Sequence, residues 1–298
     1  MKKALLALAI FSTSHLAWAG GLLTNTNQSA AFVRNPSRDA VIDIDGVYSN
    51  PAGVNFMSKG FHIGLSLQSA KQSRDITTTF PALAFNINRP GEKSHKYQGK
   101  ALAPVIPSFQ LAQVWDKWSL QAGFALTGGG GKCKFDEGLG SFETPFSLIP
   151  YMVNAANPAN TPISYSLDAY MKGRQYYFGL QVGAGYKISN NISAYLGLRA
   201  VYATCNYQGY VKNFQLCTPN GEKLPDPVAA PIMNAAMPGV EDPTITLNTD
   251  QHDLGWTPIL GIDWKINKYL NIAAKYEFQT RMSLKNKTNE MSDYAKNV

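Results

Sequence analysis

The chain has 298 residues and a formal net charge of +7, with 16% charged and 11% aromatic residues. Its lysines and arginines are scattered singly rather than in blocks, which argues against a nucleic-acid partner. After the first twenty residues no window holds the roughly 18 continuous apolar residues that a transmembrane helix needs. These properties leave secreted β proteins and outer-membrane β-barrels as candidate classes.

The N-terminus predicts an export signal. Lys2 and Lys3 form a basic start, an apolar run covers residues 4–11, and Ala17-Trp18-Ala19 is an A-x-A cleavage site. The apolar run is too short to cross the ~30 Å hydrocarbon core of a bilayer as an anchor. Residues 1–19 are therefore expected to be a signal peptide, so the chain is expected to leave the cytoplasm.

A polar segment, residues 20–60, follows the signal and precedes any regular element. It contains the turn Asn50-Pro51-Ala52-Gly53, because proline fixes φ and glycine tolerates positive φ. A surface loop is the simplest interpretation of such a turn. We treat this segment as a separate N-terminal unit, followed by a β region over residues 61–298.

From residue 61 the apolar residues recur with a period of two, which predicts strands with one apolar and one polar side. In the stretch from Tyr176 to Tyr186, every second residue is apolar and both ends are tyrosine. At ~3.3 Å per residue and ~45° tilt this stretch spans roughly 23 Å, close to the ~25 Å apolar band of an outer-membrane barrel. A β-sandwich also alternates, but aromatic residues at both ends of the apolar face favour the barrel. The predicted strands lie near residues 61–69, 108–115, 117–127, 174–188, 191–203, 256–266 and 270–284.

Connection lengths support an antiparallel transmembrane barrel. Short turns occur near residues 115–118, 189–191 and 267–269, and long connections near 69–103, 128–172 and 212–250. In outer-membrane barrels the short turns are periplasmic and the long loops extracellular. Seven strands are an odd number, and no alternating strand ends the chain. We therefore expect an N-terminal portion of a longer barrel protein.

Catalytic and metal-binding patterns are not found in the sequence. His62, His95 and His252 lie in unrelated places, and no nucleophile or phosphate-binding motif is present. A site around His252 with Asp250 and Asp253 is the weaker alternative. The three cysteines are an odd number; a Cys205–Cys217 bridge stays open. We expect no enzymatic activity, no cofactor and no metal.

Three stretches carry a family resemblance. They are NQSAAFVRNPSRDAVIDIDGVYSNPAG, GFALTGGGGKCKFDEGLGSFE and GWTPILGIDWKINKYLNIAAKYEFQTRMSL. With them the chain resembles the outer-membrane long-chain fatty-acid transporters of the FadL type, which include aromatic-hydrocarbon channels. The resemblance implies a fourteen-stranded barrel, about half of it present here, whose lumen is plugged by an N-terminal hatch.

The resemblance also implies roles for two glycine-containing motifs. Asn50, Pro51, Ala52 and Gly53 would form the hatch motif, which packs against a kinked third strand. Gly128, Gly129, Gly130 and Gly131 follow that strand and would break it to open the wall laterally, since glycine suits bulges and breaks. The alternative is that the tetraglycine merely begins an extracellular loop.

Two apolar stretches inside long loops are candidates for capturing a hydrophobic substrate, because exposed apolar patches usually bind something. The alternative is that they form loop helices that pack on each other. A fatty acid also needs a cation, and lumen-facing candidates are Arg199, Lys275 and Arg281, with Lys265, Arg34 and Arg38 as further options. These charges could instead pair with Asp263 and Glu277. The loop candidates are Phe146, Leu148, Ile149, Met152, Ile232 and Met233.

The sequence thus predicts a passive outer-membrane transporter for long-chain fatty acids or other hydrophobic small molecules. Thr204 stands where some relatives carry a basic residue after a matching Val-Tyr-Ala, so an uncharged hydrocarbon substrate stays open. The expected partners are the hydrophobic molecule and outer-membrane lipid. The alternative function is a structural or adhesive barrel whose long loops bind partners.

Overall fold

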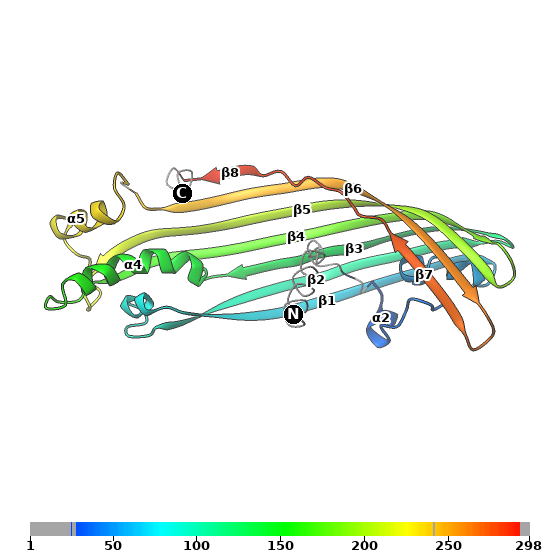
Figure 1. The fold of residues 1–298 in the computed structure, drawn as a ribbon, viewed down its shortest axis with the longest axis horizontal. Coiled ribbons are helices and arrows are strands. Elements are labelled where there is room, and N and C mark those ends of the chain that lie inside the picture. The colour runs from blue at the N-terminus through cyan, green and yellow to red at the C-terminus, as the bar shows by residue number, and fades with distance from the viewer. Residues whose placement is uncertain (1–24, 26–27, 241, 293–298) are drawn as a thin grey trace, which may run out of the picture.

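The computed structural model describes residue 25, residues 28–240 and residues 242–292. The predicted signal peptide lies outside the described residues. The described chain is dominated by one antiparallel sheet, so the expected all-β fold is confirmed at that level (Figure 1). Its strands are β1 (Gly60–Thr79), β2 (Ser94–Val114), β3 (Trp118–Phe135), β4 (Ser164–Lys187), β5 (Ile192–Cys217), β6 (Ile245–Lys265), β7 (Asn271–Glu277) and β8 (Lys287–Met291).

Each strand from β1 to β7 pairs with its neighbour in sequence, and β8 pairs with β6. β7 lies along residues 259–265 of β6, and β8 lies along residues 247–250 of it. Both short strands therefore occupy one edge, as two parts of a seventh strand position. Among the described residues, no helix is both long and apolar enough to cross a membrane.

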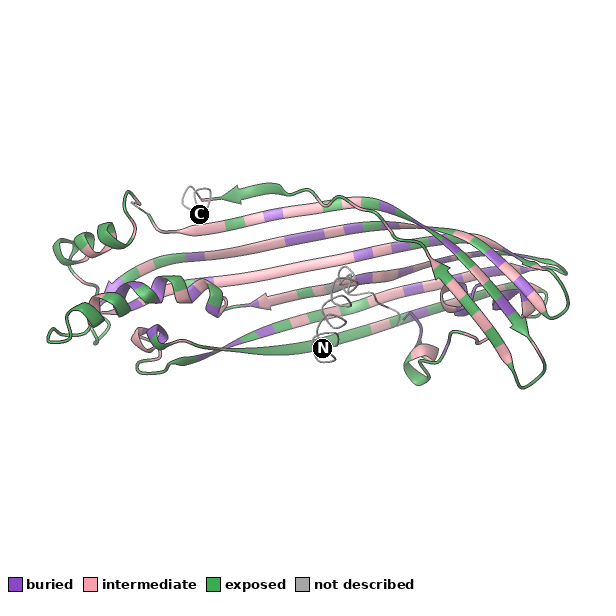
Figure 2. Cartoon of the chain, viewed as in Figure 1, coloured by how far each residue is buried: buried purple, intermediate pink, exposed green. Residues whose placement is uncertain are grey.

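The two faces of the sheet differ in exposure, as the alternating colours along the strands show (Figure 2). One face, here called the apolar face, exposes large hydrophobic side chains, among them Leu120, Leu180, Leu196, Leu260 and Ile272. The other, here called the polar face, buries hydrophilic side chains, among them Ser119, Gln121, Gln181, Ser193 and Asp263. The covered face thus includes many polar residues while large apolar residues are exposed on the other face, which is the reverse of the usual distribution in a water-soluble sheet.

Helices occupy the two ends of the sheet. α4 (Gly140–Ala156), α5 (Asp226–Ala236) and the 3-10 helix η2 (Pro81–Phe85) lie at the end with long connections, on the left of Figure 1. Residues 28–59, here called the N-terminal segment, pack against the polar face near the short turns. This segment contains α2 (Ala30–Arg34), α3 (Gly46–Ser49) and the 3-10 helix η1 (Gly53–Phe56).

The strands are longer than the apolar pattern predicted. The long connections cover residues 80–93, 136–163 and 218–244, so the predicted limits 69–103, 128–172 and 212–250 are wrong. Backbone pairing does not require apolar side chains, and the strands continue through polar residues such as Lys96, Gln98 and Lys100. Sequence periodicity therefore marks only the apolar part of each strand.

The seventh strand position departs from the predicted alternation after Glu277. Continued alternation from Leu270 predicts that Met282 and Leu284 lie on the apolar face, but they pack against a buried cluster on the polar face. Arg281, assigned to the polar face, is exposed. The physical reason is a close approach at Gly255, where an added Cβ would lie 2.5 Å from Thr280 Cγ2 and 2.7 Å from Met282 Cγ. The cluster consists of Tyr177, Val201, Ala203 and Cys205.

The cysteines do not pair. Cys133, Cys205 and Cys217 are free thiols, and Cys205 and Cys217 both lie on β5. A strand rises ~3.3 Å per residue, which separates these two residues by roughly 40 Å. A disulfide requires Cα atoms within about 7 Å, so the bridge that the sequence left open is excluded.

Candidate functional site

The turn at residues 50–53 is buried on the polar face and is held by side chains from three strands. Asn50 Nδ2 donates to Asp263 Oδ2 on β6 at 2.5 Å. Gln121 Nε2 on β3 donates to the Pro51 carbonyl at 2.8 Å, and the Ser193 hydroxyl on β5 donates to the Ala52 carbonyl. The turn is therefore docked on the sheet, and it is not the surface loop that its sequence most simply suggests.

Gly53 permits this docking because it lies directly against the anchor. A Cβ built there would overlap Asn50 Nδ2 and lie 2.8 Å from Asp263 Oδ2. Asp263 is fully buried and also accepts from Asn271 Nδ2 at 2.9 Å. A buried carboxylate needs such donors, since its desolvation is costly. The turn thus contributes one of the two donors that Asp263 has on the described chain.

The charges predicted for carboxylate binding are engaged with one another. Arg199 donates to the two carboxylate oxygens of Glu277 at 2.8 and 2.9 Å, and Lys275 lies 2.9 Å from the same carboxylate. Both cations also lie close to the Tyr48 ring of the N-terminal segment, whose centroid is 4.8 Å from the Arg199 guanidinium and 4.9 Å from Lys275 Nζ. This is the paired arrangement of the alternative interpretation, to which Tyr48 adds cation–π contacts.

The other predicted cations do not join this group. Arg38 is buried and contacts Asp45 at 2.6 Å and Asp43 at 3.2 Å. Its hydrogen bond with Asp45 raises the pKa of the Arg38 guanidinium. Arg34, Lys265 and Arg281 are exposed.

The tetraglycine lies in a defect of the sheet. β3 continues through it to Phe135, so the alternative in which it begins a loop is wrong. The pairing of β3 with β4 shifts register around Gly128 and again before Gly131. Gly129 and Gly131 have φ of +101° and +71°, values that favour glycine. Two bulges therefore fall within four residues.

The same stretch lacks regular pairing on its other side. On the short-turn side, pairing between β2 and β3 ends at Phe109 and Phe124. Pairing begins again only at Ala101 and Cys133. A cavity of about 170 Å³ lies at this gap, and its lining includes Leu102, Ile106, Gly128 and Tyr176. The sheet is thus interrupted beside the tetraglycine.

Asn25 and Gln28, at the start of the described chain, reach this gap. The backbone N–H of Asn25 donates to the Thr127 carbonyl at 2.9 Å, and its side-chain amide donates to the Leu126 carbonyl at 3.0 Å. Gln28 Nε2 also donates to Leu126 at 2.8 Å. Residues before the docked turn thus satisfy carbonyls of β3 where the strand enters the tetraglycine.

A second cavity, of about 550 Å³, lies between α4, the outer parts of β4–β6 and the end of α5. Of the predicted capture residues, Phe146 and Ile149 line it, whereas Leu148, Met152, Ile232 and Met233 do not. Phe146 and Ile149, three residues apart on one side of α4, are buried, whereas Leu148 and Met152 are exposed. Its other lining residues are Ser141, Phe142, Pro145, Met171, Tyr207, Gln208, Gly209, Tyr210, Val211, Ala236, Met237, Ile245 and Leu247.

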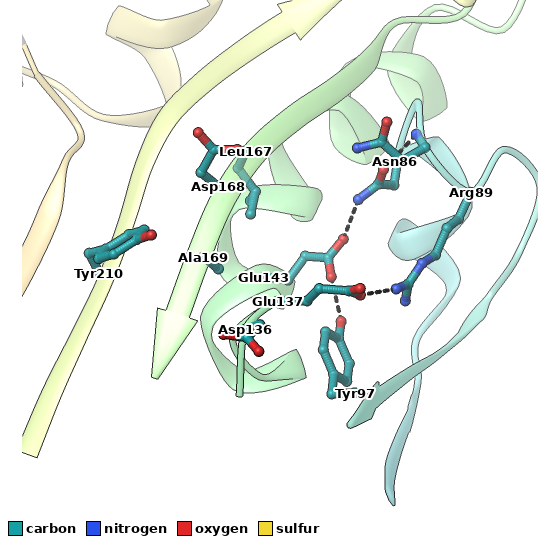
Figure 3. A pocket seen from close by; sticks show the side chains of 11 residues that line it. Asn86, Arg89, Tyr97, Asp136, Glu137, Glu143, Leu167, Asp168, Ala169 and Tyr210 are labelled. Carbon is teal, nitrogen blue, oxygen red and sulfur yellow. Dashed lines mark hydrogen bonds and ion pairs between the residues drawn. The ribbon is translucent and has the colours of Figure 1, made fainter. Parts of the chain in front are cut away.

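α4 is held over the strand ends by a buried carboxylate (Figure 3). Glu143 accepts from Asn86 Nδ2 at 2.6 Å, from the Tyr165 hydroxyl at 2.7 Å and from the Tyr97 hydroxyl. Burial alone would raise the pKa of Glu143, but these hydrogen bonds outweigh it and lower the pKa below its usual range. Glu143 also contacts His95 Nδ1 at 3.3 Å. A polar cavity of about 490 Å³ adjoins this anchor.

Sequence reasoning missed the strand side chains that hold the turn and the aromatic residues of the apolar cavity. Alternation places Gln121, Gln181 and Ser193 on the polar side of their predicted strands, and the position of Gln121 and Ser193 close to the short turns was the available signal. Gln181 Nε2 donates to the Val47 carbonyl at 2.7 Å. Tyr207 and Tyr210 lie beyond the apolar part of β5, where periodicity gives no information.

Neither the family models nor the curated proteins searched contain a match to this chain. In the part of the chain that the structure describes, no three His, Cys, Asp or Glu side chains are grouped to hold a metal ion. The site is therefore defined by its own geometry: a docked turn, an interrupted sheet beside it and an apolar cavity under the loops.

Proposed function

We propose that this protein is a passive outer-membrane transporter for hydrophobic small molecules, of the FadL type that its sequence resembles. The sheet would be part of a transmembrane barrel, with the apolar face toward lipid and the polar face toward the lumen. The N-terminal segment would be the hatch. Long-chain fatty acids and uncharged hydrocarbons are the substrate classes to test.

The observation that carries this proposal is the double attachment of the N-terminal region. Its turn is held on the sheet by the hydrogen bond from Asn50 to Asp263. Asn25 and Gln28 donate hydrogen bonds to a β3 carbonyl beside the tetraglycine. A shift of the segment would therefore disturb both places together. In a transporter this connects the position of the hatch to an opening in the wall between β2 and β3.

The apolar cavity supports capture at the loop end. Burying an acyl chain yields ~0.8 kcal/mol per CH₂, and most of the cavity lining is apolar or aromatic. No lysine or arginine is among the described lining residues. Arg199 and Lys275, the candidate carboxylate partners, already share Glu277. A substrate would therefore be recognised mainly by its apolar body.

Uptake of radiolabelled oleate and of an aromatic hydrocarbon tests the proposal, in cells that lack their own hydrophobic-compound transporters. The cells express the complete protein as wild type, as Asn50→Ala, or as the control Gly173→Ala, with outer-membrane assembly measured by surface labelling. We expect normal assembly of all three and reduced uptake for Asn50→Ala alone. Correct assembly with no uptake of either compound by the wild type would refute transport and favour the adhesive barrel.

A further inference from the structure

The apolar face carries a cluster of cations just beyond its hydrophobic part. Lys100 on β2, Lys134 on β3 and Lys172 on β4 are directly opposite one another across the two ladders. One level nearer the short turns, Lys132 on β3 faces Arg174 on β4. These five residues are here called the basic cluster. The three strands are neighbours in the middle of the sheet (Figure 1).

Strand alternation places the basic cluster on the same face as the exposed hydrophobic side chains. On β4, Arg174 and Lys172 continue the even-numbered positions that include Tyr176, Leu180 and Val182. Leu180 and Val182 are about half exposed, at 49% and 52%. Two residues rise ~6.6 Å along a strand, or roughly 5 Å along the membrane normal at ~45° tilt. The cluster thus begins about 5 Å beyond Tyr176.

Such an arrangement is unfavourable without a counter-ion. Directly opposed side chains on neighbouring strands have Cβ atoms about 5 Å apart, and like charges there destabilise the pair. Within the described chain only Lys134 of the five forms an ion pair, with Asp136 at 2.5 Å. Lys172 donates to the neutral Gln208 amide at 3.1 Å. Arg174 attracts the Asp250 carboxylate across β5, but its Nε is buried and has no hydrogen-bond partner on the described residues.

We propose that the basic cluster binds the phosphate groups of the phosphorylated glycolipid in the outer leaflet. This rests on the proposed outer-membrane location, which puts the loop end outside and the cluster at headgroup level. The apolar side chains below would contact the acyl chains of the same lipid. Several cations on three rigid strands suit a ligand with more than one phosphate, because charge-assisted bonds to phosphate are strong.

Lipid binding to the complete protein in detergent tests this inference directly. Isothermal titration with diphosphoryl lipid A compares wild type with Lys100→Gln/Lys134→Gln/Lys172→Gln. The matched control is Lys117→Gln/Lys265→Gln/Lys268→Gln, which removes three exposed charges at the short-turn end. A lysine near an anionic lipid surface contributes about a factor of five. We therefore expect roughly 100-fold weaker binding for the cluster variant and an unchanged affinity for the control.

Two further ligands identify the source of recognition. Lipid A without its phosphates should bind the wild type as weakly as intact lipid A binds the cluster variant, and phosphatidylglycerol should bind more weakly than lipid A. Equal binding of either ligand and intact lipid A, or equal affinities of the two triple variants, would overturn the proposal. Circular dichroism and gel mobility of the unheated protein check folding of each variant. Lipid A binding without any substrate uptake would refute transport and leave this inference standing.

Discussion

Gly53→Ala should release the N-terminal segment from the sheet. The added methyl group would overlap Asn50 Nδ2 and lie 2.8 Å from Asp263 Oδ2, so the bond between these two side chains must lengthen or break. The carboxylate is fully buried, and the neighbouring Ser193 and Gln121 contacts leave the turn little room to move aside.

Two effects set the magnitude. Loss of a hydrogen bond to a charged group costs about 1.5–3 kcal/mol, and forcing a methyl group into a packed site costs about 1–3 kcal/mol. Because the two effects overlap at the same atoms, we expect about 3 kcal/mol in total. That loss raises the population of the undocked segment roughly 100-fold.

Hydrogen exchange of the purified protein measures this population. Amides in residues 46–56 should exchange roughly 100-fold faster in Gly53→Ala, while amides of β4 and β5 stay protected. Gly173→Ala is the matched control, because a Cβ there meets only the Tyr207 ring, at 3.8 Å. Unchanged exchange at residues 46–56 in Gly53→Ala would refute the claim that this contact anchors the segment.

Three further predictions concern other parts of the molecule. The pKa of Glu143 is lowered in the folded protein, so the stabilising effect of this carboxylate is present above its unfolded pKa of about 4.3 and is lost as pH falls through the folded pKa. Hydrogen exchange of the α4 amides should therefore become faster below pH ~4 in the wild type. Glu143→Gln should remove this pH dependence. Gly129→Ala should disturb the β3–β4 bulge and alter uptake, since its Cβ would meet the Gln175 carbonyl at 2.5 Å and φ is +101°; wild-type uptake rates would contradict this. Alkylation in denaturant without reductant should modify both Cys205 and Cys217. The mass that alkylation adds to the intact protein measures this.

The sequence predicted the chemistry of the strands better than their extent. Alternation along β4 and β6 identified the exposed Leu180 and Leu260 and the buried Gln181 and Asp263 correctly, because side-chain direction has a strict period of two. Strand ends were missed because pairing continues through polar residues, which leave no periodic signal. β3 is the clearest case, since it continues through the tetraglycine to Phe135.

The seventh strand position shows where alternation fails. Phase is preserved only while the ladder is regular, and regular pairing with β6 ends at Glu277. Beyond it Thr280 and Met282 approach Gly255 closely, so the side chains that follow change face. Nothing local to residues 278–286 indicates this. The cause lies on β6, and Arg281 was misassigned for that reason.

The anchor of the turn and the basic cluster depend on strand pairing between residues that are far apart in the sequence. Asn50 and Asp263 are an unremarkable turn residue and an unremarkable strand carboxylate in the sequence, and become an anchor only when β6 lies under the turn. Lys100, Lys134 and Lys172 likewise look like singly scattered charges in the sequence, which is why the sequence argued against a nucleic-acid partner. The strand pairing aligns them on one face at one level. The absence of a basic run along the chain therefore excludes a linear polyanion-binding segment, but it does not exclude a basic surface assembled across three strands.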